Sequence, residues 1–196
     1  MEFNRLLSSA ISTYGEPSLS SIRKEQKTSN NLVIDRKKYY LINNLVEIDQ
    51  WIKEAEEVGE VAVDTETTSL DPHQADLVGI SLSSKIGKAC YIPIGHKSKK
   101  CLDKKLVLKK LKSLLEDPSI KKIGQNIKFD FILLSKHGVN LNSMEDTMLM
   151  SYVLDAGKNR HNMDTLSKIH LNHKTISFKD LVGTGKKEIN FSEVEI

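Results

Sequence analysis

The sequence has few of the residues that build disulfide frameworks, thiol metal sites and membrane spans. Only two of its 196 residues are cysteines, Cys90 and Cys101, and their spacing is not that of a Cys-x-x-Cys pair. Both are therefore expected to be reduced thiols of an intracellular protein. No apolar run approaches the roughly 18 residues of a membrane span, and the N-terminus does not resemble a signal peptide. We expect a cytoplasmic protein without membrane contact.

Aromatic residues are also scarce, at 6%, and the formal net charge is only +3. The charge is unevenly distributed, because eight lysines and one acid, Asp103, lie between Lys97 and Lys112. Such a run could follow a phosphate backbone. It could equally be the solvated face of a helix, and the sequence leaves both interpretations open.

The chain divides into a polar leader, residues 1–36, and a globular part, residues 37–196. Strands are expected at residues 39–42, 61–66, 77–83, 88–94 and 122–124. Helices are expected at residues 45–58, 103–116, 127–137, 146–154 and 162–172, with a further short helix near 5–13. Strands and helices alternate after an antiparallel start, which indicates a mixed α/β sheet flanked by helices.

Two carboxylates stand at the end of the expected strand that begins Val61-Ala62-Val63. Strand residues i and i+2 share a face, so Asp64 and Glu66 point to one spot. Two such charges about 4 Å apart repel by roughly 4 kcal/mol at an effective dielectric near 20, and a bound cation relieves that repulsion. Oxygen ligands suit Mg²⁺ or Mn²⁺ rather than zinc.

Asp130 is the candidate third carboxylate, in the first turn of an expected helix. A first-turn acid is also an ordinary stabiliser of the helix dipole. Asn126, just before it, is equally consistent with a helix N-cap. The metal interpretation requires all three carboxylates within bridging distance of shared ions.

Five blocks occur in one order along the chain: Asp64-Thr-Glu-Thr-Thr-Ser-Leu-Asp71, Gly124-Gln-Asn-Ile-Lys-Phe-Asp130, Asp146-Thr-Met-Leu-Met-Ser-Tyr152, Arg160-His-Asn-Met-Asp-Thr-Leu166 and His173-Lys-Thr-Ile-Ser-Phe178. Together they resemble the proofreading domain of bacterial DNA polymerase I, a DEDD-type 3′–5′ exonuclease. The resemblance covers roughly residues 37–190. It implies a ribonuclease H-like fold, with three antiparallel strands followed by parallel ones.

The resemblance also implies two-metal chemistry with Mg²⁺ or Mn²⁺. Asp64 would bridge both ions, Glu66 would serve the ion on the nucleophile side, and Asp130 the ion on the leaving-group side. Further matched positions are implied to contact the DNA strand: Thr65, Leu70, Asn126, Phe129, Arg160 and Phe178. Leu70 is implied to wedge against terminal bases and Phe178 to stack on one. Ordinary core packing is the alternative for both.

One motif of the resembled family is not found. Its third motif, Tyr-x-x-x-Asp, supplies the fourth metal ligand, but no tyrosine follows Tyr152 in these 196 residues. We therefore expect an incomplete domain whose two-metal site lacks one ligand and whose activity is impaired. The expected substrate is a single-stranded or frayed DNA 3′ end, with a separate polymerase chain as a possible partner. The alternative is a catalytically inactive nucleic-acid-binding remnant.

Overall fold

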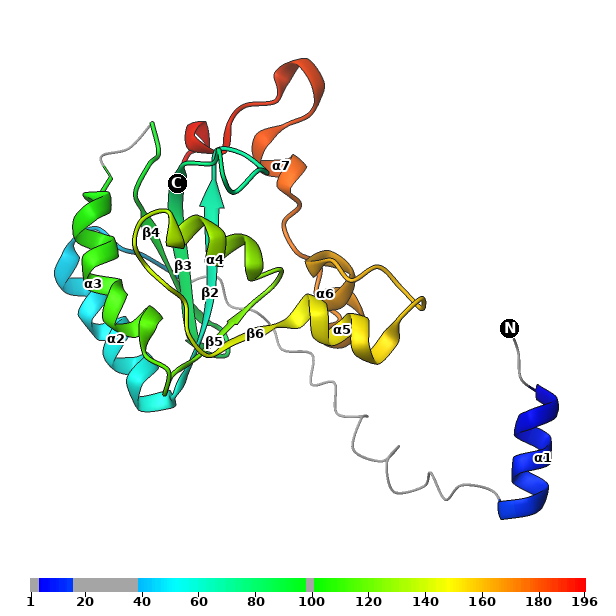
Figure 1. The fold of residues 1–196 in the computed structure, drawn as a ribbon. Helices are drawn as coiled ribbons and strands as arrows, with labels where there is room; N and C mark the ends of the chain where they lie inside the picture. Colours follow the sequence, from blue (N-terminus) through cyan, green and yellow to red (C-terminus); the bar gives the residue numbers. More distant parts are fainter. Residues whose placement is uncertain (1–3, 16–38, 98–100) are drawn as a thin grey trace.

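The structure, a computed structural model, describes residues 4–15, 39–97 and 101–196 and is built on a six-stranded mixed sheet (Figure 1). Its strands are β1 (Tyr39–Leu41), β2 (Glu60–Thr67), β3 (Leu77–Lys85), β4 (Lys88–Pro93), β5 (Lys121–Gly124) and β6 (Met144–Asp146). Their order is β1-β4-β3-β2-β5-β6. Strands β2, β3 and β4 are antiparallel, whereas β5 is parallel to β2, and β6 to β5. The predicted mixed sheet is confirmed, and β1 adds a parallel edge strand beside β4.

The helices agree with the expected segments to within a few residues, except near the C-terminus. They are α1 (Asn4–Tyr14), α2 (Leu45–Val58), α3 (Lys104–Glu116), α4 (Lys128–Ser135), α5 (Thr147–Asp155), α6 (Met163–Leu171) and α7 (Phe178–Val182). Two 3-10 turns follow, η2 (Gly185–Lys187) and η3 (Phe191–Glu193). The sequence predicted neither α7 nor these turns. The short helix expected in the leader corresponds to α1, and the rest of the leader lies mostly outside the described residues.

Helix α2 shows how local sequence fixes an element. The Asn44 side chain accepts hydrogen bonds from the N–H groups of Val46 and Glu47, both at 3.1 Å, as an N-cap does. At the other end Gly59 has φ 80°, the left-handed conformation that ends a helix. Between these caps the buried residues include Ile48 and Trp51, spaced to face the sheet.

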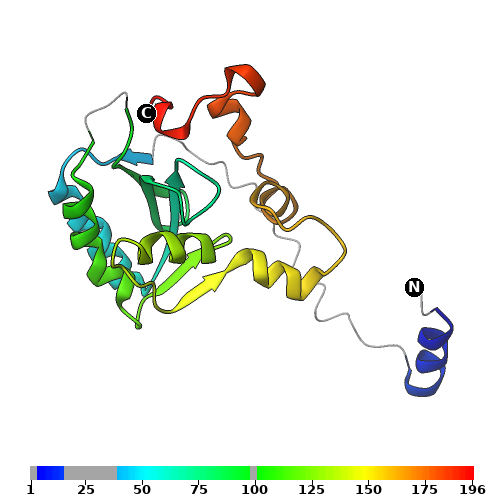
Figure 2. The ribbon, with the colours of Figure 1, turned by 45° about the horizontal axis from the view of Figure 1, so that its top comes forward.

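The main hydrophobic core lies on one face of the sheet. Alternate residues of β2, Val61, Val63 and Thr65, are buried, and the two valines join the core shared by α2, α3 and α4. At the C-terminal end of β2 the opposite face is covered by the chain around α7 and η3, where a smaller apolar cluster forms around Phe191. Figures 1 and 2 show these C-terminal segments returning to the end of β2, while α5 and α6 extend away beyond β6.

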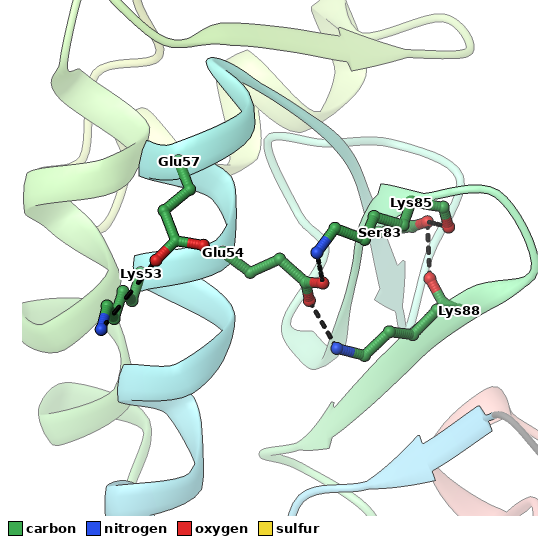
Figure 3. Close-up of polar contacts among 6 residues, drawn as sticks. All are labelled: Lys53, Glu54, Glu57, Ser83, Lys85 and Lys88. Atoms are coloured by element: carbon green, nitrogen blue, oxygen red, sulfur yellow. Dashed lines mark hydrogen bonds and ion pairs between the residues drawn. The ribbon is translucent and has the colours of Figure 1, made fainter.

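A buried carboxylate fastens the β3–β4 hairpin to α2 (Figure 3). Glu54 forms ion pairs with Lys85 and Lys88, both at 2.7 Å. The Lys88 ammonium also lies 4.8 Å from the ring centroid of Trp51, a cation–π contact. These contacts fix the hairpin relative to the helix that covers it.

Two helices bury fewer of the side chains that helical spacing places on the inner face. Spacing puts Leu106 on the inner face of α3, but Leu106 is half exposed and Val107 is buried instead. In α6, spacing puts Met163, Leu166, Ile169 and His170 on one side, but of these only Leu166 is buried. The reason is that α6 lies beyond the sheet and has little protein to pack against.

Three of the described lysines of the basic run form ion pairs within the protein. Lys110 pairs with Asp49 at 2.6 Å, and Lys112 pairs with Glu116 at 3.5 Å. Lys97 pairs with Glu193 at 2.9 Å. Lys99 and Lys100 lie outside the described residues. Within the described ranges, no helix is both long and apolar enough to cross a membrane.

Candidate active site

The site forms where β2 extends beyond the end of its neighbour β5. Strand β5 pairs with β2 only over Glu60–Ala62, so the N–H of Thr65 lies beyond the end of that ladder. Asp130, from the first turn of α4, takes the vacated place: its Oδ1 accepts hydrogen bonds from the Thr65 N–H at 2.9 Å and the Thr65 hydroxyl at 2.5 Å. Asp130 of α4 is thereby anchored to Thr65, the residue that separates Asp64 and Glu66 in β2.

A pocket of about 790 Å³ opens at this point. Eight of the nine predicted site residues line it: Asp64, Thr65, Glu66, Leu70, Asn126, Phe129, Asp130 and Phe178. They come from β2, the loop after it, the start of α4 and α7. The structure therefore brings together segments that are more than a hundred positions apart in the chain.

The three carboxylates share an environment that resists full ionisation. Burial, together with the charges of Asp64 and Asp130, raises the pKa of Glu66 to about 7. Burial also raises the pKa of Asp130 to about 7, with the charge of Asp64 adding to the effect and the Thr65 hydrogen bonds opposing it. The pKa of Asp64 is raised by the protein packed around it. Burial and mutual repulsion thus make it costly for all three groups to be ionised at once.

The donor set fits a hard divalent cation, although its arrangement is not yet that of a metal centre. Three carboxylates supply only oxygen, as Mg²⁺ and Mn²⁺ prefer. Among the described residues, no group of three His, Cys, Asp or Glu side chains is arranged to hold a metal ion. The Thr65 hydrogen bonds give a physical reason, because they direct one Asp130 oxygen toward the backbone of β2.

Asn126 is not the N-cap of α4. That position is held by Ile127, without a side-chain cap. Asn126 instead has φ 61°, a left-handed conformation that asparagine tolerates. Its N–H donates to Asp146 at 3.0 Å, and its side-chain oxygen accepts from Lys128. The turn thus places Asn126 at the pocket instead of capping the helix.

Two apolar residues of the pocket, Leu70 and Phe178, are exposed, which argues against core packing for them. Leu70, on the loop after β2, is 93% exposed, and Phe178 is 53% exposed. The Phe178 ring stacks on Phe191, with centroids 6.0 Å apart and planes 12° apart. Both side chains therefore offer apolar surface to whatever enters the pocket.

Arg160 lies apart from this pocket. It borders a separate hollow of about 700 Å³ with Tyr152 and His161. His161 is buried there, bonded to the Ser151 hydroxyl at 2.7 Å and packed against the Tyr152 ring.

Sequence analysis missed several polar and aromatic residues of the pocket wall. Lys179, Glu188, Asn190 and Phe191 all line it. They belong to the C-terminal region whose sequence lacks clear periodicity, so only their proximity to the Phe178 block could have drawn attention to them.

Comparisons with known proteins agree with this geometry. The family model described as "3′-5′ exonuclease" matches residues 39–194. The chain is 42% identical over 186 residues to DNA polymerase I of Rhizobium leguminosarum, covering 84% of this chain and 18% of that protein. It is 41% identical over 164 residues to DNA polymerase I of Pseudomonas aeruginosa, covering 81% of this chain and 18% of that protein. The chain thus spans about a fifth of the length of these relatives.

The solved structure of Brucella melitensis NrnC with bound Mg²⁺ is similar to this fold. Its TM-score is 0.54 at 26% identity, covering 80% of this chain and 72% of that chain. The sheet and its pocket accordingly define a ribonuclease H-like nuclease domain. More specifically, the chain belongs to the 3′–5′ exonuclease family, and its domain is of the type found in DNA polymerase I.

Proposed function

We propose that this domain hydrolyses phosphodiester bonds at DNA 3′ ends with the help of Mg²⁺ or Mn²⁺. The observation that carries the proposal is the pocket at the end of β2, where three carboxylates with raised pKa values adjoin exposed apolar side chains. Neighbouring carboxyl groups that are costly to ionise together suit divalent cations, whose charge favours the ionised form. Exposed Leu70 and Phe178 suit unpaired bases.

Asp64, Glu66 and Asp130 are the residues that would hold the ions. Bound divalent ions in such sites lower the pKa of a water nucleophile and stabilise charge on the phosphate. The fold holds these carboxylates in place, since Asp64 and Glu66 lie on a central strand and Asp130 is hydrogen-bonded to Thr65. Phe178 would stack on the terminal base, a contact worth ~1–3 kcal/mol per base, and Leu70 would wedge beside it.

The test is digestion of a 3′-labelled single-stranded DNA in Mg²⁺ and in Mn²⁺. Asp64→Ala should slow release of nucleotides on the order of 10²-fold or more, because it removes the shared ligand. Glu56→Gln, an exposed acid of α2 outside the pocket, serves as the control and should digest at the wild-type rate. Digestion by the wild type no faster than by Asp64→Ala would leave the alternative of an inactive nucleic-acid-binding domain.

A further inference from the structure

A row of aromatic rings connects the sheet behind the carboxylates to the wall of the pocket. Its members in order are Tyr91, His96, Phe191 and Phe178, with neighbouring ring centroids 5.7, 5.9 and 6.0 Å apart. The first two do not line the pocket, whereas the last two do. The row thus leads from the interior to the surface where a base would stack.

At the inner end, Tyr91 lies against β3, the strand that pairs with the one carrying Glu66. Its hydroxyl occupies the space above Gly79, where an added Cβ would come within 2.0 Å of it. Gly79 is the register partner of Glu66 on β2. Only glycine at this position lets the Tyr91 ring lie flat against β3 and reach His96.

His96 is buried, and its two hydrogen bonds fix its tautomer. Nδ1 is 3.0 Å from the Val194 carbonyl oxygen, which can only accept, so Nδ1 carries the proton. In the neutral ring Nε2 then accepts from the Tyr91 hydroxyl, 2.6 Å away. Burial favours this neutral form by lowering the pKa of His96, with the Val194 bond opposing the shift. Both ring nitrogens therefore hold a defined partner.

Residues 190–194, here called the clamp segment, are held at several points beside His96. The Lys97 N–H donates to the Ser192 carbonyl at 2.7 Å. The Asn190 side-chain amide donates to the Thr68 carbonyl at 2.9 Å, which connects the segment to the loop that carries Leu70. The clamp segment also presents the buried Phe191 ring to the pocket side.

Phe178 depends on this segment for its orientation. It lies on α7, a helix of 5 residues, and so short a helix has little stability of its own. Its contact to the interior is the stacked Phe191 ring, while Val182, at the other end of α7, packs with Phe191 in the same small cluster. Movement of Phe191 would therefore tilt the face that Phe178 presents.

We propose that His96 is a positioning residue for the terminal base: it holds the clamp segment against the sheet, and Phe191 in turn holds the Phe178 ring in its stacking orientation. This inference rests on the proposed function, since it assigns His96 to the same pocket. His96 itself touches neither metal nor substrate in this scheme.

The test measures base stacking separately from backbone binding. Two single-stranded oligonucleotides are compared, one ending in 2-aminopurine and one ending in an abasic residue, with Ca²⁺ in place of Mg²⁺ to limit cleavage. The wild type should prefer the base-bearing end by about tenfold, a value within the range of one stacked base. His96→Ala should reduce that preference to near unity while its affinity for the abasic end changes less than about twofold.

Two variants guard against a general folding defect. Phe191→Leu removes the ring contact and leaves both His96 hydrogen bonds possible, and it should lose the preference as His96→Ala does. His137→Ala removes another partly buried imidazole, one outside the pocket at the end of α4, and should keep the preference.

The outcomes separate this inference from the proposed function. A His96→Ala protein that keeps its preference, or that loses affinity for both ends in parallel, overturns the positioning role. A wild type with no preference overturns it as well, yet the hydrolytic function would still be judged by the digestion assay with Asp64→Ala.

Discussion

At the scale of single residues, the pocket carboxylates link protonation to folding. The pKa of Glu66 is raised from 4.5 to about 7 on folding. Between these values the folded state binds a proton that the unfolded state releases, so the added stability is complete below about pH 4.5 and is lost as pH rises through about 7. Asp130 acts in the same direction, since its pKa is also raised to about 7.

We expect the metal-free protein, kept in a chelator, to unfold at lower temperature at pH 8 than at pH 5.5. Glu66→Gln should flatten this dependence and stabilise the protein at pH 8 on the order of 1–3 kcal/mol, because it removes a charge that burial disfavours. Differential scanning calorimetry at both pH values measures the effect, with Glu56→Gln as control. A Glu66→Gln protein with the wild-type pH dependence would contradict this assignment.

Residue spacing alone pointed to part of the proposed site. Asp64 and Glu66 follow from strand alternation, whereas Asp130 became a candidate only through the family resemblance, because an acid at a helix start is also an ordinary stabiliser of the helix dipole. The conformation of Asn126 does not follow, because it depends on a hydrogen bond to Asp146 that is contributed by a different strand end. The position of Arg160 depends on how α5 and α6 pack, which local sequence does not determine.

At the scale of elements, a pair of salt bridges connects α2 to the β3–β4 hairpin. Its centre is Glu54, whose pKa is lowered by its hydrogen bonds to Lys85 and Lys88. Helix and strand boundaries here were predictable from caps and turn residues such as Asn44 and Gly59. The pairing between them was not, because nothing local identifies which acid of α2 will meet the lysines of the hairpin.

Glu54→Ala should destabilise the protein by about 1–3 kcal/mol, since it leaves two lysines near the hairpin without their buried partner. Glu57→Ala is the matched control on the same helix. Its ion pair with Lys53 is 3.9 Å long and largely exposed, so its loss should cost less than about 0.5 kcal/mol. Urea unfolding measures the loss in the free energy of unfolding for both variants. Equal losses would show that the Glu54 contact to the hairpin stabilises the protein no more than an exposed ion pair does.

At the scale of the whole molecule, the mixed sheet was predictable from the alternation of strands and helices, while the C-terminal return was not. The segments that close the pocket, α7 and the clamp segment, lack periodicity because they are short and make contacts mainly with residues distant in sequence.

Helix α5 has an exposed apolar face, on which Leu149, Val153 and Leu154 are all exposed. An apolar helix face of this kind favours association or aggregation.

We expect the 196-residue polypeptide to associate as its concentration rises. Val153→Lys combined with Leu154→Glu should lower the average mass at high concentration, because it places charges on the exposed side of α5. Sedimentation velocity over a concentration series measures this, and an unchanged distribution would assign any association to another surface. Met163→Lys on α6 tests whether the effect is specific to α5.

Strand β2 occupies an interior place in the sheet, bonded to β3 on one edge and to β5 on the other. Its amides can exchange with solvent only when a neighbouring strand separates, so this region should belong to the slowest-exchanging unit of the domain. The loop with Leu70 and the short helix with Phe178 have no such protection. Local fluctuations can therefore loosen the apolar wall of the pocket many times while the carboxylates stay in place, and the carboxylate arrangement should disappear only when the whole sheet opens.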